Sequence, residues 1–194
     1  MADDAAEAAL RRLWQAGARH DVVTQVMRAY GPEVLGYLLG ALRGEGEAAD
    51  AFSQFTLNLW QASESFRGDS SFRTWAYALA RHAVGRIVRE RGRRRRHVAL
   101  PSEIEGIAAR VRTETQEHLR TEAKDRLARL REELDPDDQL ILTLRVDRGF
   151  AWPDVAKVMA DDGAADERKV ATLRKRFERI KDRLRRRAKE LGLG

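Results

Sequence analysis

The sequence predicts an all-α protein with two small helical domains joined by a linker. In several stretches apolar residues recur every three or four positions, which is the spacing of one face of a helix. The alternation of apolar and polar residues that marks strands is not found, and the 194 residues include only four prolines. A charge-rich segment with few apolar residues separates the periodic stretches, so two small cores fit the chain better than one.

The composition excludes several classes of protein. The chain has no cysteine, so it can form neither disulfides nor thiolate metal sites. No apolar run approaches the roughly 20 residues needed to span a bilayer, and the N-terminus is acidic where a secretory signal is basic. We therefore expect a cytoplasmic protein without membrane contacts. The formal net charge of +6 is concentrated in two tracts, which indicates a polyanionic partner.

The first predicted domain covers residues 22–96, after an N-terminal arm or short helix at 1–21. Residues 22–42 have helical spacing interrupted at Gly31–Pro32, which one kinked helix or two successive helices would satisfy. A further helix follows the segment RGEGEAAD, and a loop, SESFRGDSS, leads into another helix from about Ser71. The apolar faces predicted for these two helices carry Phe52, Phe55 and Leu59 in the first, and Phe72, Trp75, Ala76, Leu79, Ala83 and Ile87 in the second.

A basic tract and a linker follow this domain. The sequence RIVRERGRRRR ends the first domain at residue 96. Residues 97–122 have low hydrophobicity and alternating charge, which is typical of a linker, and we expect them to be helical in part from Glu103 onward. The second domain is predicted over residues 123–191.

The second domain has the clearest local pattern. Asp135 and Pro136 supply a helix cap and a first helical position, further acids lie in the first turn, and Gly149 ends that helix. A short helix, WPDVAKVM, breaks at ADDGAAD and precedes one long helix with an apolar stripe and basic residues on its other faces. A short helix, a turn and a basic helix are the order of a helix-turn-helix, whose second helix enters the major groove. The stripe comprises Val170, Leu173, Phe177, Ile180 and Leu184.

These stretches resemble a known family. The segment SFRGDSSFRTWAYALARHAVGRIVRERGRRRR is similar to regions 2.3 and 2.4 of the extracytoplasmic-function (ECF) sigma factors, small two-domain members of the bacterial sigma-70 family. The C-terminal unit resembles their region 4, and the resemblance covers about residues 22–96 and 124–190. It implies a subunit that joins RNA polymerase core, reads two promoter elements and helps to melt the DNA. The most specific motifs are Phe72-Arg73-Thr74-Trp75 and Ala80-Arg81, following WQASESFRG.

The resemblance also implies which residues meet promoter DNA. Arginines around a helix supply phosphate contacts whose energy comes from counterion release, and polar side chains reach base edges. In the loop, an aromatic ring and a guanidinium could stack on an unpaired base. Core packing is nevertheless the stronger expectation for the large aromatics Phe72, Trp75 and Trp152. The implied DNA-binding residues are Phe66, Arg67, Arg73, Arg81, His82, Arg86 and Arg89 in the first domain, and Arg168, Lys169, Thr172, Arg174, Lys175, Arg176 and Arg179 in the second.

The implied protein partner is RNA polymerase core, through its beta-prime clamp and beta flap. The acidic helix that binds core in the family corresponds to residues 47–60, but its acidic motif is thin, and Ser53-Gln54 stands where a Gln-Glu pair is common. Some groups of the family are controlled by Ser/Thr kinases and others by an anti-sigma factor, which makes Ser53 and Thr56 candidate phosphorylation sites. The stronger expectation is that Thr56 packs or hydrogen-bonds within its own helix and that a partner protein regulates the factor. The implied core-binding residues are Glu47, Asp50, Gln54, Leu57 and Asn58.

Two further departures from the family's pattern bear on DNA readout. His82 and Arg86 stand where an asparagine and an aspartate are common, so the family's base preference cannot be copied to this chain. The turn before the last helix is longer than usual by several residues, through DDGAADERK. Either the turn bulges or the recognition helix begins early.

Two other functions share these features. A free-standing helix-turn-helix regulator would bind operator DNA without polymerase, usually as a symmetric dimer. A basic RNA-binding adaptor would show no preference for duplex promoter sequence. The four histidines have no ligand spacing, no nucleophile stands in a recognisable constellation, and there is no glycine-rich phosphate loop. We therefore expect no metal, no cofactor and no enzymatic activity.

Overall fold

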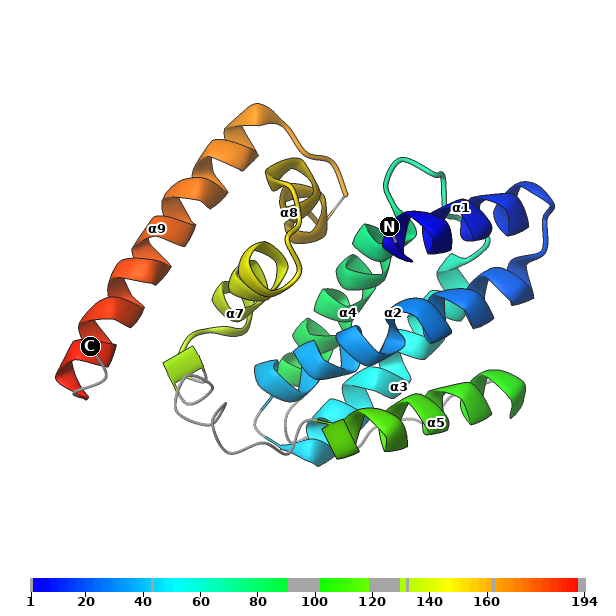
Figure 1. The fold of residues 1–194 in the computed structure, drawn as a ribbon, viewed down its shortest axis with the longest axis horizontal. Coiled ribbons are helices and arrows are strands. Elements are labelled where there is room, and N and C mark those ends of the chain that lie inside the picture. Colours follow the sequence, from blue (N-terminus) through cyan, green and yellow to red (C-terminus); the bar gives the residue numbers. More distant parts are fainter. Residues whose placement is uncertain are drawn as a thin grey trace. The chain divides into compact units, whose positions relative to one another are not determined.

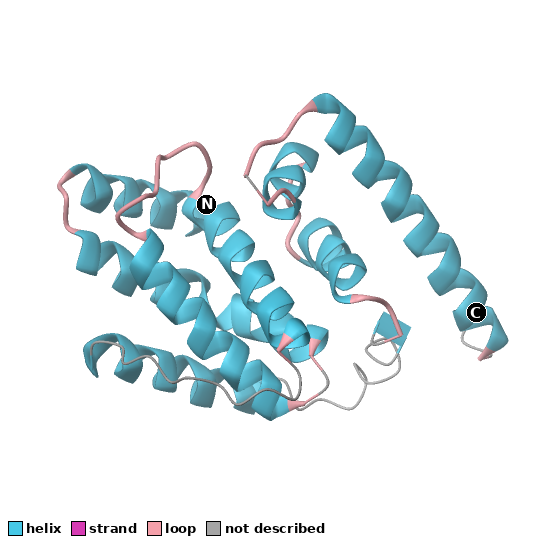
Figure 2. Cartoon of the chain, turned by 180° about the vertical axis from the view of Figure 1, so that it is seen from behind, coloured by secondary structure: helices cyan, strands magenta, loops and turns pink. Residues whose placement is uncertain are grey.

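The structure is a computed structural model, and the residues that it describes are 2–42, 44–90, 102–118, 130–131, 133–161 and 163–191. Across these ranges the chain forms helices joined by turns and loops, without a strand (Figure 2). The predicted all-α fold class is therefore confirmed. The chain divides into two compact units, residues 1–120 and 121–194, and each unit is described by itself.

The described part of the first unit is a helical bundle. Its helices are α1 (Ala2–Gln15), α2 (Arg19–Ala41), α3 (Glu45–Ala62), α4 (Phe72–Arg89) and α5 (Ser102–His118). α2, α3 and α4 pack against one another and form the centre of the bundle (Figure 1). α1 contacts α2 and α4, whereas α5 contacts α2 and α3.

α2 is one continuous helix in spite of Gly31 and Pro32. Of the two alternatives that the sequence left open, the single helix is correct. Pro32 is exposed, and Gly31 is buried beneath α5, where a Cβ atom would lie 3.3 Å from Val111 Cγ1. The missing side chain of Gly31 therefore lets α5 approach α2 closely.

The core of the first unit confirms one predicted face and corrects another. Phe52, Phe55 and Leu59 of α3 are fully buried, as predicted. In α4, the predicted residues Trp75 and Leu79 remain partly exposed. α4 packs against both α2 and α3, so its buried face is wider and lies further round the helix than the stripe predicted from the sequence. The residues on this face are Phe72, Ala76, Tyr77, Ala80, Ala83, Val84 and Ile87.

The helix α5 corrects the prediction that residues 97–122 are a linker. Residues 102–118 form this helix, which packs on α2 and α3 and so belongs to the first unit. Its apolar residues follow the spacing of one helix face, but the charged residues around them lower the hydrophobicity of the segment and obscured the pattern. The buried residues of the stripe are Ile104, Ile107, Ala108 and Val111.

Both ends of the first unit extend beyond the predicted boundaries of 22 and 96. At the N-terminus the short-helix alternative is correct, because α1 is helical and its Leu10 is fully buried. The N-terminal segment is therefore part of the bundle. The basic residues 91–96 and the first part of the predicted linker, 97–101, lie outside the described residues.

The second unit contains the predicted short helix, turn and long helix. Asp135 caps the first helix by accepting a hydrogen bond from the Asp138 amide at 2.9 Å, and Pro136 follows at the first helical position. Gly149, with a φ of 68°, lies just after the end of this helical segment, as predicted. The elements are α7 (Pro136–Leu142), the π-helical segment η2 (Thr143–Asp147) that continues it, α8 (Trp152–Met159) and α9 (Glu167–Glu190).

Candidate nucleic-acid interface

The long helix α9 is anchored on one side and exposed on the other. Leu173, Phe177 and Ile180 are buried, and both α7 and α8 pack against α9. Phe177 meets Trp152 of α8 edge to face, with ring centroids 5.4 Å apart. The predicted packing roles of Leu173, Phe177 and Trp152 agree with this arrangement. The opposite side of α9 is exposed.

The start of α9 determines how long the preceding turn is. α9 begins at Glu167, so the last three residues of DDGAADERK belong to the helix, and the alternative of an early recognition helix is correct. Asp166 caps the helix by accepting from the Lys169 amide at 2.6 Å. Lys169 Nζ also donates to the Ala164 carbonyl at 3.0 Å, which ties the turn to the first turn of α9.

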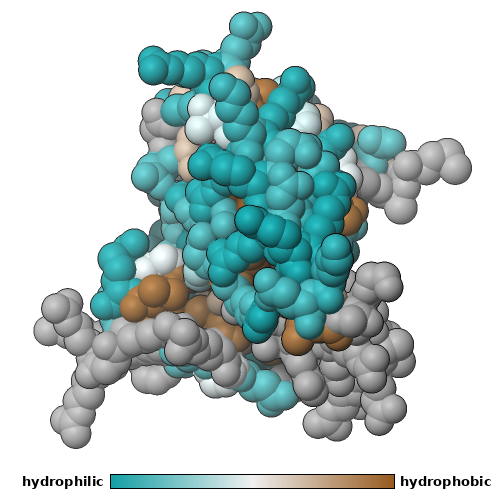
Figure 3. All heavy atoms as spheres, turned by 90° about the vertical axis from the view of Figure 1, so that its left-hand side faces the viewer, coloured by the Kyte–Doolittle hydropathy of each residue, from teal (hydrophilic) through white to brown (hydrophobic). Residues whose placement is uncertain are grey.

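Most basic residues predicted to bind DNA from the second unit lie on the exposed side of α9. Helical geometry places Arg168, Lys175 and Arg179 opposite the buried stripe. Arg174 lies at the edge of this face, with its guanidinium 5.9 Å from the centre of the Trp152 ring. Figure 3 shows that the surface over α9 is mostly hydrophilic. The exposed members of the predicted set are Arg168, Lys169, Thr172, Arg174, Lys175 and Arg179.

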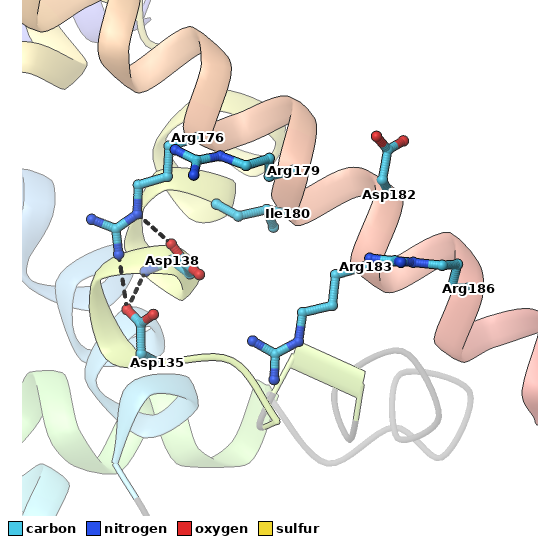
Figure 4. Close-up of a pocket in the computed structure, with 8 residues that line it drawn as sticks. All are labelled: Asp135, Asp138, Arg176, Arg179, Ile180, Asp182, Arg183 and Arg186. Atoms are coloured by element: carbon cyan, nitrogen blue, oxygen red, sulfur yellow. Dashed lines mark hydrogen bonds and ion pairs between the residues drawn. The ribbon is translucent and has the colours of Figure 1, made fainter.

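Arg176 differs from these residues because its guanidinium is held within the unit (Figure 4). It forms ion pairs with Asp135, at 3.1 Å, and with Asp138 of α7. Burial raises the pKa of the Asp138 carboxyl, and the hydrogen bond and charge of Arg176 oppose that rise. We therefore assign Arg176 to fastening α9 onto α7 and leave it out of the DNA contacts proposed below.

Further arginines on α9 were not among the residues predicted to bind DNA. Arg183 and Arg186 follow Arg179 at helical spacing, and the three line a cavity of about 470 Å³ between α7 and α9 (Figure 4). Arg183 donates to the Glu133 carbonyl at 2.9 Å, so part of its hydrogen-bonding capacity is used internally. The spacing of three and four residues from Arg179 was the sequence signal that could have added them.

The predicted basic residues of α4 divide between two faces of the helix. His82, Arg86 and Arg89 are exposed and share one face, whereas Arg81 is half-buried on another. Arg86 Nε forms an ion pair with Glu90 at 3.1 Å. The structure therefore brings three of the five predicted basic residues of α4 together and separates Arg81 and Arg73 from them.

Arg73, also predicted to meet DNA, has an internal partner. Its guanidinium forms two hydrogen bonds with the carboxylate of Glu33 on α2, at 2.8 and 2.9 Å. The side chains of Arg73 and Glu33 are only 19% and 14% exposed. Such a bidentate pair fixes α4 to α2, so we do not include Arg73 among the proposed DNA contacts.

The loop that joins α3 to α4, residues 63–71, places Phe66 and Arg67 differently. The Phe66 ring is half-buried and packs against Phe72 and Trp75, with centroids 4.6 and 4.7 Å away. Arg67 is exposed and pairs with Asp69 across the loop at 3.2 Å. Of the two residues predicted to stack on a base, Arg67 has the exposed side chain. Phe66 instead packs between the loop and α4.

The residues predicted to bind core lie on one face of α3. This face is opposite the buried stripe of Phe52, Phe55 and Leu59, as helical spacing requires. Asp50 is exposed, and the other four are half-buried. Gln54 Nε2 donates to Asn58 Oδ1 at 2.7 Å, one turn along the helix. The members of this face are Glu47, Asp50, Gln54, Leu57 and Asn58.

The two hydroxyls proposed as phosphorylation sites have different surroundings. Thr56 is fully buried, and its Oγ1 donates to the Phe52 carbonyl at 2.9 Å. This burial contradicts a role for Thr56 as a modification site and supports the alternative of hydrogen bonding within its own helix. Ser53 is exposed, donates to the Ala49 carbonyl at 3.0 Å and accepts from Arg112 of α5 at 3.4 Å.

The described residues offer no candidate site for a metal ion and no candidate membrane span. Among them, no group of three or more histidine or acidic side chains is placed to hold a metal ion. Within the same part of the chain, no helix combines the length and the apolar character needed to cross a membrane. The candidate sites are, in the first unit, the basic face of α4 with the loop at 63–71 and, in the second unit, the basic face of α9.

Comparison with known proteins agrees with this arrangement. Residues 26–94, which contain most of α2 and all of α3 and α4, match the model of sigma-70 region 2. The chain is also 29% identical over 159 residues to a protein named RNA polymerase sigma-H factor, from Pseudomonas aeruginosa. That alignment covers 79% of this chain and 79% of the relative. Both findings support the assignment of the chain to the sigma-70 family.

Proposed function

We propose that this chain is an alternative sigma factor, which binds RNA polymerase core, recognises promoter DNA and helps to open it for transcription initiation. The observation that carries the proposal is the position of the sigma-70 region 2 match, residues 26–94. The match contains the loop at 63–71 and the basic face of α4. A sigma factor is a regulatory subunit, so we assign the chain no catalytic step of its own.

In this proposal the second unit supplies the contacts to duplex DNA, as region 4 does in the family. α8, the turn and α9 have the order of a helix-turn-helix, and the exposed side of α9 would enter the major groove. Arg168, Lys175 and Arg179 would neutralise phosphates, because their side chains are exposed opposite the buried stripe. Thr172 and Arg174 would reach base edges from the same half of the helix.

The first unit would contact the promoter element that melts. His82, Arg86 and Arg89 form an exposed basic face that can follow the backbone of one strand. The loop at 63–71 begins where α3 ends and leads into α4, and its exposed Arg67 would stack on an unpaired base.

Core polymerase would bind the face of α3 defined by Glu47, Asp50, Gln54, Leu57 and Asn58, through its beta-prime clamp. The second unit would meet the beta flap. We further propose that the chain is a member of the ECF group and works in the cytoplasm, where core polymerase and DNA are found. An anti-sigma factor is the favoured regulator, and Ser53 is the hydroxyl on α3 that a kinase could reach.

Binding of DNA with and without core polymerase tests this function. A pool of genomic fragments from the bacterium that encodes the chain is incubated with the chain alone, with core alone and with both. We expect a defined set of fragments to be retained only by the combination, because the chain alone has few contacts with each promoter element. Retention of the same fragments by the chain without core would favour the free-standing regulator, and displacement by single-stranded RNA would favour the adaptor.

A further inference from the structure

The N-terminal helix α1 is linked to the start of α4 by one carboxylate. Glu7 Oε2 accepts from the Phe72 amide at 3.0 Å, and Glu7 Oε1 accepts from the Arg73 amide at 2.9 Å. Glu7 Oε1 also accepts from the Tyr30 hydroxyl of α2 at 2.9 Å. One side chain therefore joins α1, α2 and α4, and its longest step along the sequence, to Arg73, spans 66 residues.

Glu7 completes the cap of α4. The first N–H groups of a helix have no partner within the helix, and a carboxylate there is favoured by the helix dipole. The Ser71 side chain, at the end of the loop, accepts from the Thr74 amide at 3.0 Å. The Phe72 and Arg73 amides are served by Glu7. The amides of the first two residues of α4 thus find their hydrogen-bond partner on α1.

A second contact from α1 reaches the loop itself. The Trp14 ring meets Phe66 edge to face, with centroids 5.7 Å apart. Trp14 also lies over Gly68, where a Cβ atom would be 3.0 Å from Trp14 Cη2. Gly68 has a φ of 78°, a conformation that favours glycine. The backbone of the loop is therefore seated against the Trp14 ring at its turn.

The loop also has ring contacts from α4, where Phe72 and Trp75 pack against Phe66, and two exposed ion pairs. The Arg67–Asp69 ion pair is exposed, at 79% and 74%, and such pairs contribute little to stability. The pair of Arg19 with Glu64, at 3.3 Å, is exposed as well. From α1, Glu7 at the start of α4 and Trp14 over the middle of the loop thus supply half-buried contacts, alongside the Arg73–Glu33 pair that fixes α4 to α2.

We infer that α1 is a positioning element for strand separation, in which Glu7 and Trp14 hold the loop at 63–71 in the conformation that takes up an unpaired base. The inference rests on the proposed function. In this proposal neither Glu7 nor Trp14 touches DNA. Glu7 fixes where α4 begins, and Trp14 fixes the position of the loop backbone. Together they hold the loop that carries Arg67 in one conformation.

The variants for the test separate positioning from folding. Glu7→Gln keeps the shape of the side chain but turns one acceptor oxygen into an NH2 group, which cannot accept from an amide. Trp14→Ala removes the ring over Gly68, and Trp14→Phe is the milder variant should Trp14→Ala lose helicity. Glu105→Gln is the matched control, because Glu105 is an exposed carboxylate on α5. Far-UV circular dichroism and binding to core polymerase show whether each variant is folded.

The experiment compares one promoter in two forms. A genomic fragment that the wild-type holoenzyme transcribes is used as duplex and, with mismatched strands over the start-proximal element, as a pre-opened template. On the duplex we expect Glu7→Gln and Trp14→Ala to transcribe about tenfold less than wild type, the factor for losing one charge-assisted hydrogen bond or its equivalent. On the pre-opened template we expect all variants to transcribe within about twofold of wild type, since the strand-separation step is bypassed. The control Glu105→Gln should stay within about twofold of wild type on both templates.

Each other outcome overturns the inference. Equal losses on both templates would mean that α1 only stabilises the fold, and full activity of the variants on the duplex would mean that the loop does not need α1. A failure of the proposed function is distinguishable from both, because the wild-type holoenzyme would then transcribe no fragment at all.

Discussion

Replacing Lys175 and Arg179 together by glutamate is expected to lower the affinity of the holoenzyme for duplex promoter DNA by about a hundredfold at 0.15 M salt. Both residues are exposed on α9, opposite the buried stripe. Each reversal removes a cation that displaces counterions from a phosphate and adds a charge that repels it. Fluorescence anisotropy at several salt concentrations should also show that the negative slope of log affinity against log salt becomes shallower by about 2.

Arg176 provides the control for that experiment on the same helix. Its guanidinium is paired with Asp135 and Asp138, so Arg176→Gln should lower the stability of the second unit and leave the salt slope unchanged. Thermal unfolding followed by circular dichroism separates the two effects. If the Lys175 and Arg179 double variant bound DNA as wild type does, α9 would not be the groove-reading helix.

Thr56→Glu is expected to unfold the first unit instead of switching its activity. The Thr56 side chain is fully buried, and its hydroxyl bonds to the Phe52 carbonyl of its own helix. A carboxylate placed there would be buried, and burying an unpaired charge costs several kcal/mol. That cost is comparable with the ~5–15 kcal/mol by which domains are stable. Urea unfolding and helicity measure the loss.

Ser53→Glu is the matched control, one turn earlier on α3. Ser53 is exposed and lies 3.4 Å from Arg112, so a carboxylate at this position meets solvent and a cation. We expect its free energy of unfolding to change by less than about 0.5 kcal/mol. A Thr56→Glu variant that stays folded and binds core more tightly than wild type would restore the charge-switch hypothesis for Thr56.

Features that depend on neighbouring residues were predictable from the sequence. The Asp135 cap, the proline after it, the break before α9 and the stripe on α9 all follow from local rules, and the structure has them. The resemblance to sigma-70 region 2 was likewise carried by a contiguous segment, the one that the family model matches. Both kinds of feature can be predicted from one sequence, because each depends only on residues that are close together in the chain.

Features that depend on distant partners were not predictable in the same way. Arg73 and Arg176 look like their exposed neighbours in sequence, and only the fold brings Glu33 to one and the α7 aspartates to the other. Helix from Glu103 onward was expected, but the packing of α5 on the bundle was not, because a narrow apolar stripe among charges resembles a solvated segment until the face of α2 that it covers is known. The link from Glu7 to the start of α4 has no local signal at all.

Run-off transcription with purified core polymerase tests the central claim most directly. Genomic fragments from the encoding bacterium serve as templates, and the reaction is run with core alone and with core plus this chain. The account predicts discrete transcripts from a defined set of fragments only when the chain is present, and fewer of them with the Lys175 and Arg179 double variant. Identical transcription with and without the chain, using core that responds to another sigma factor, would contradict it.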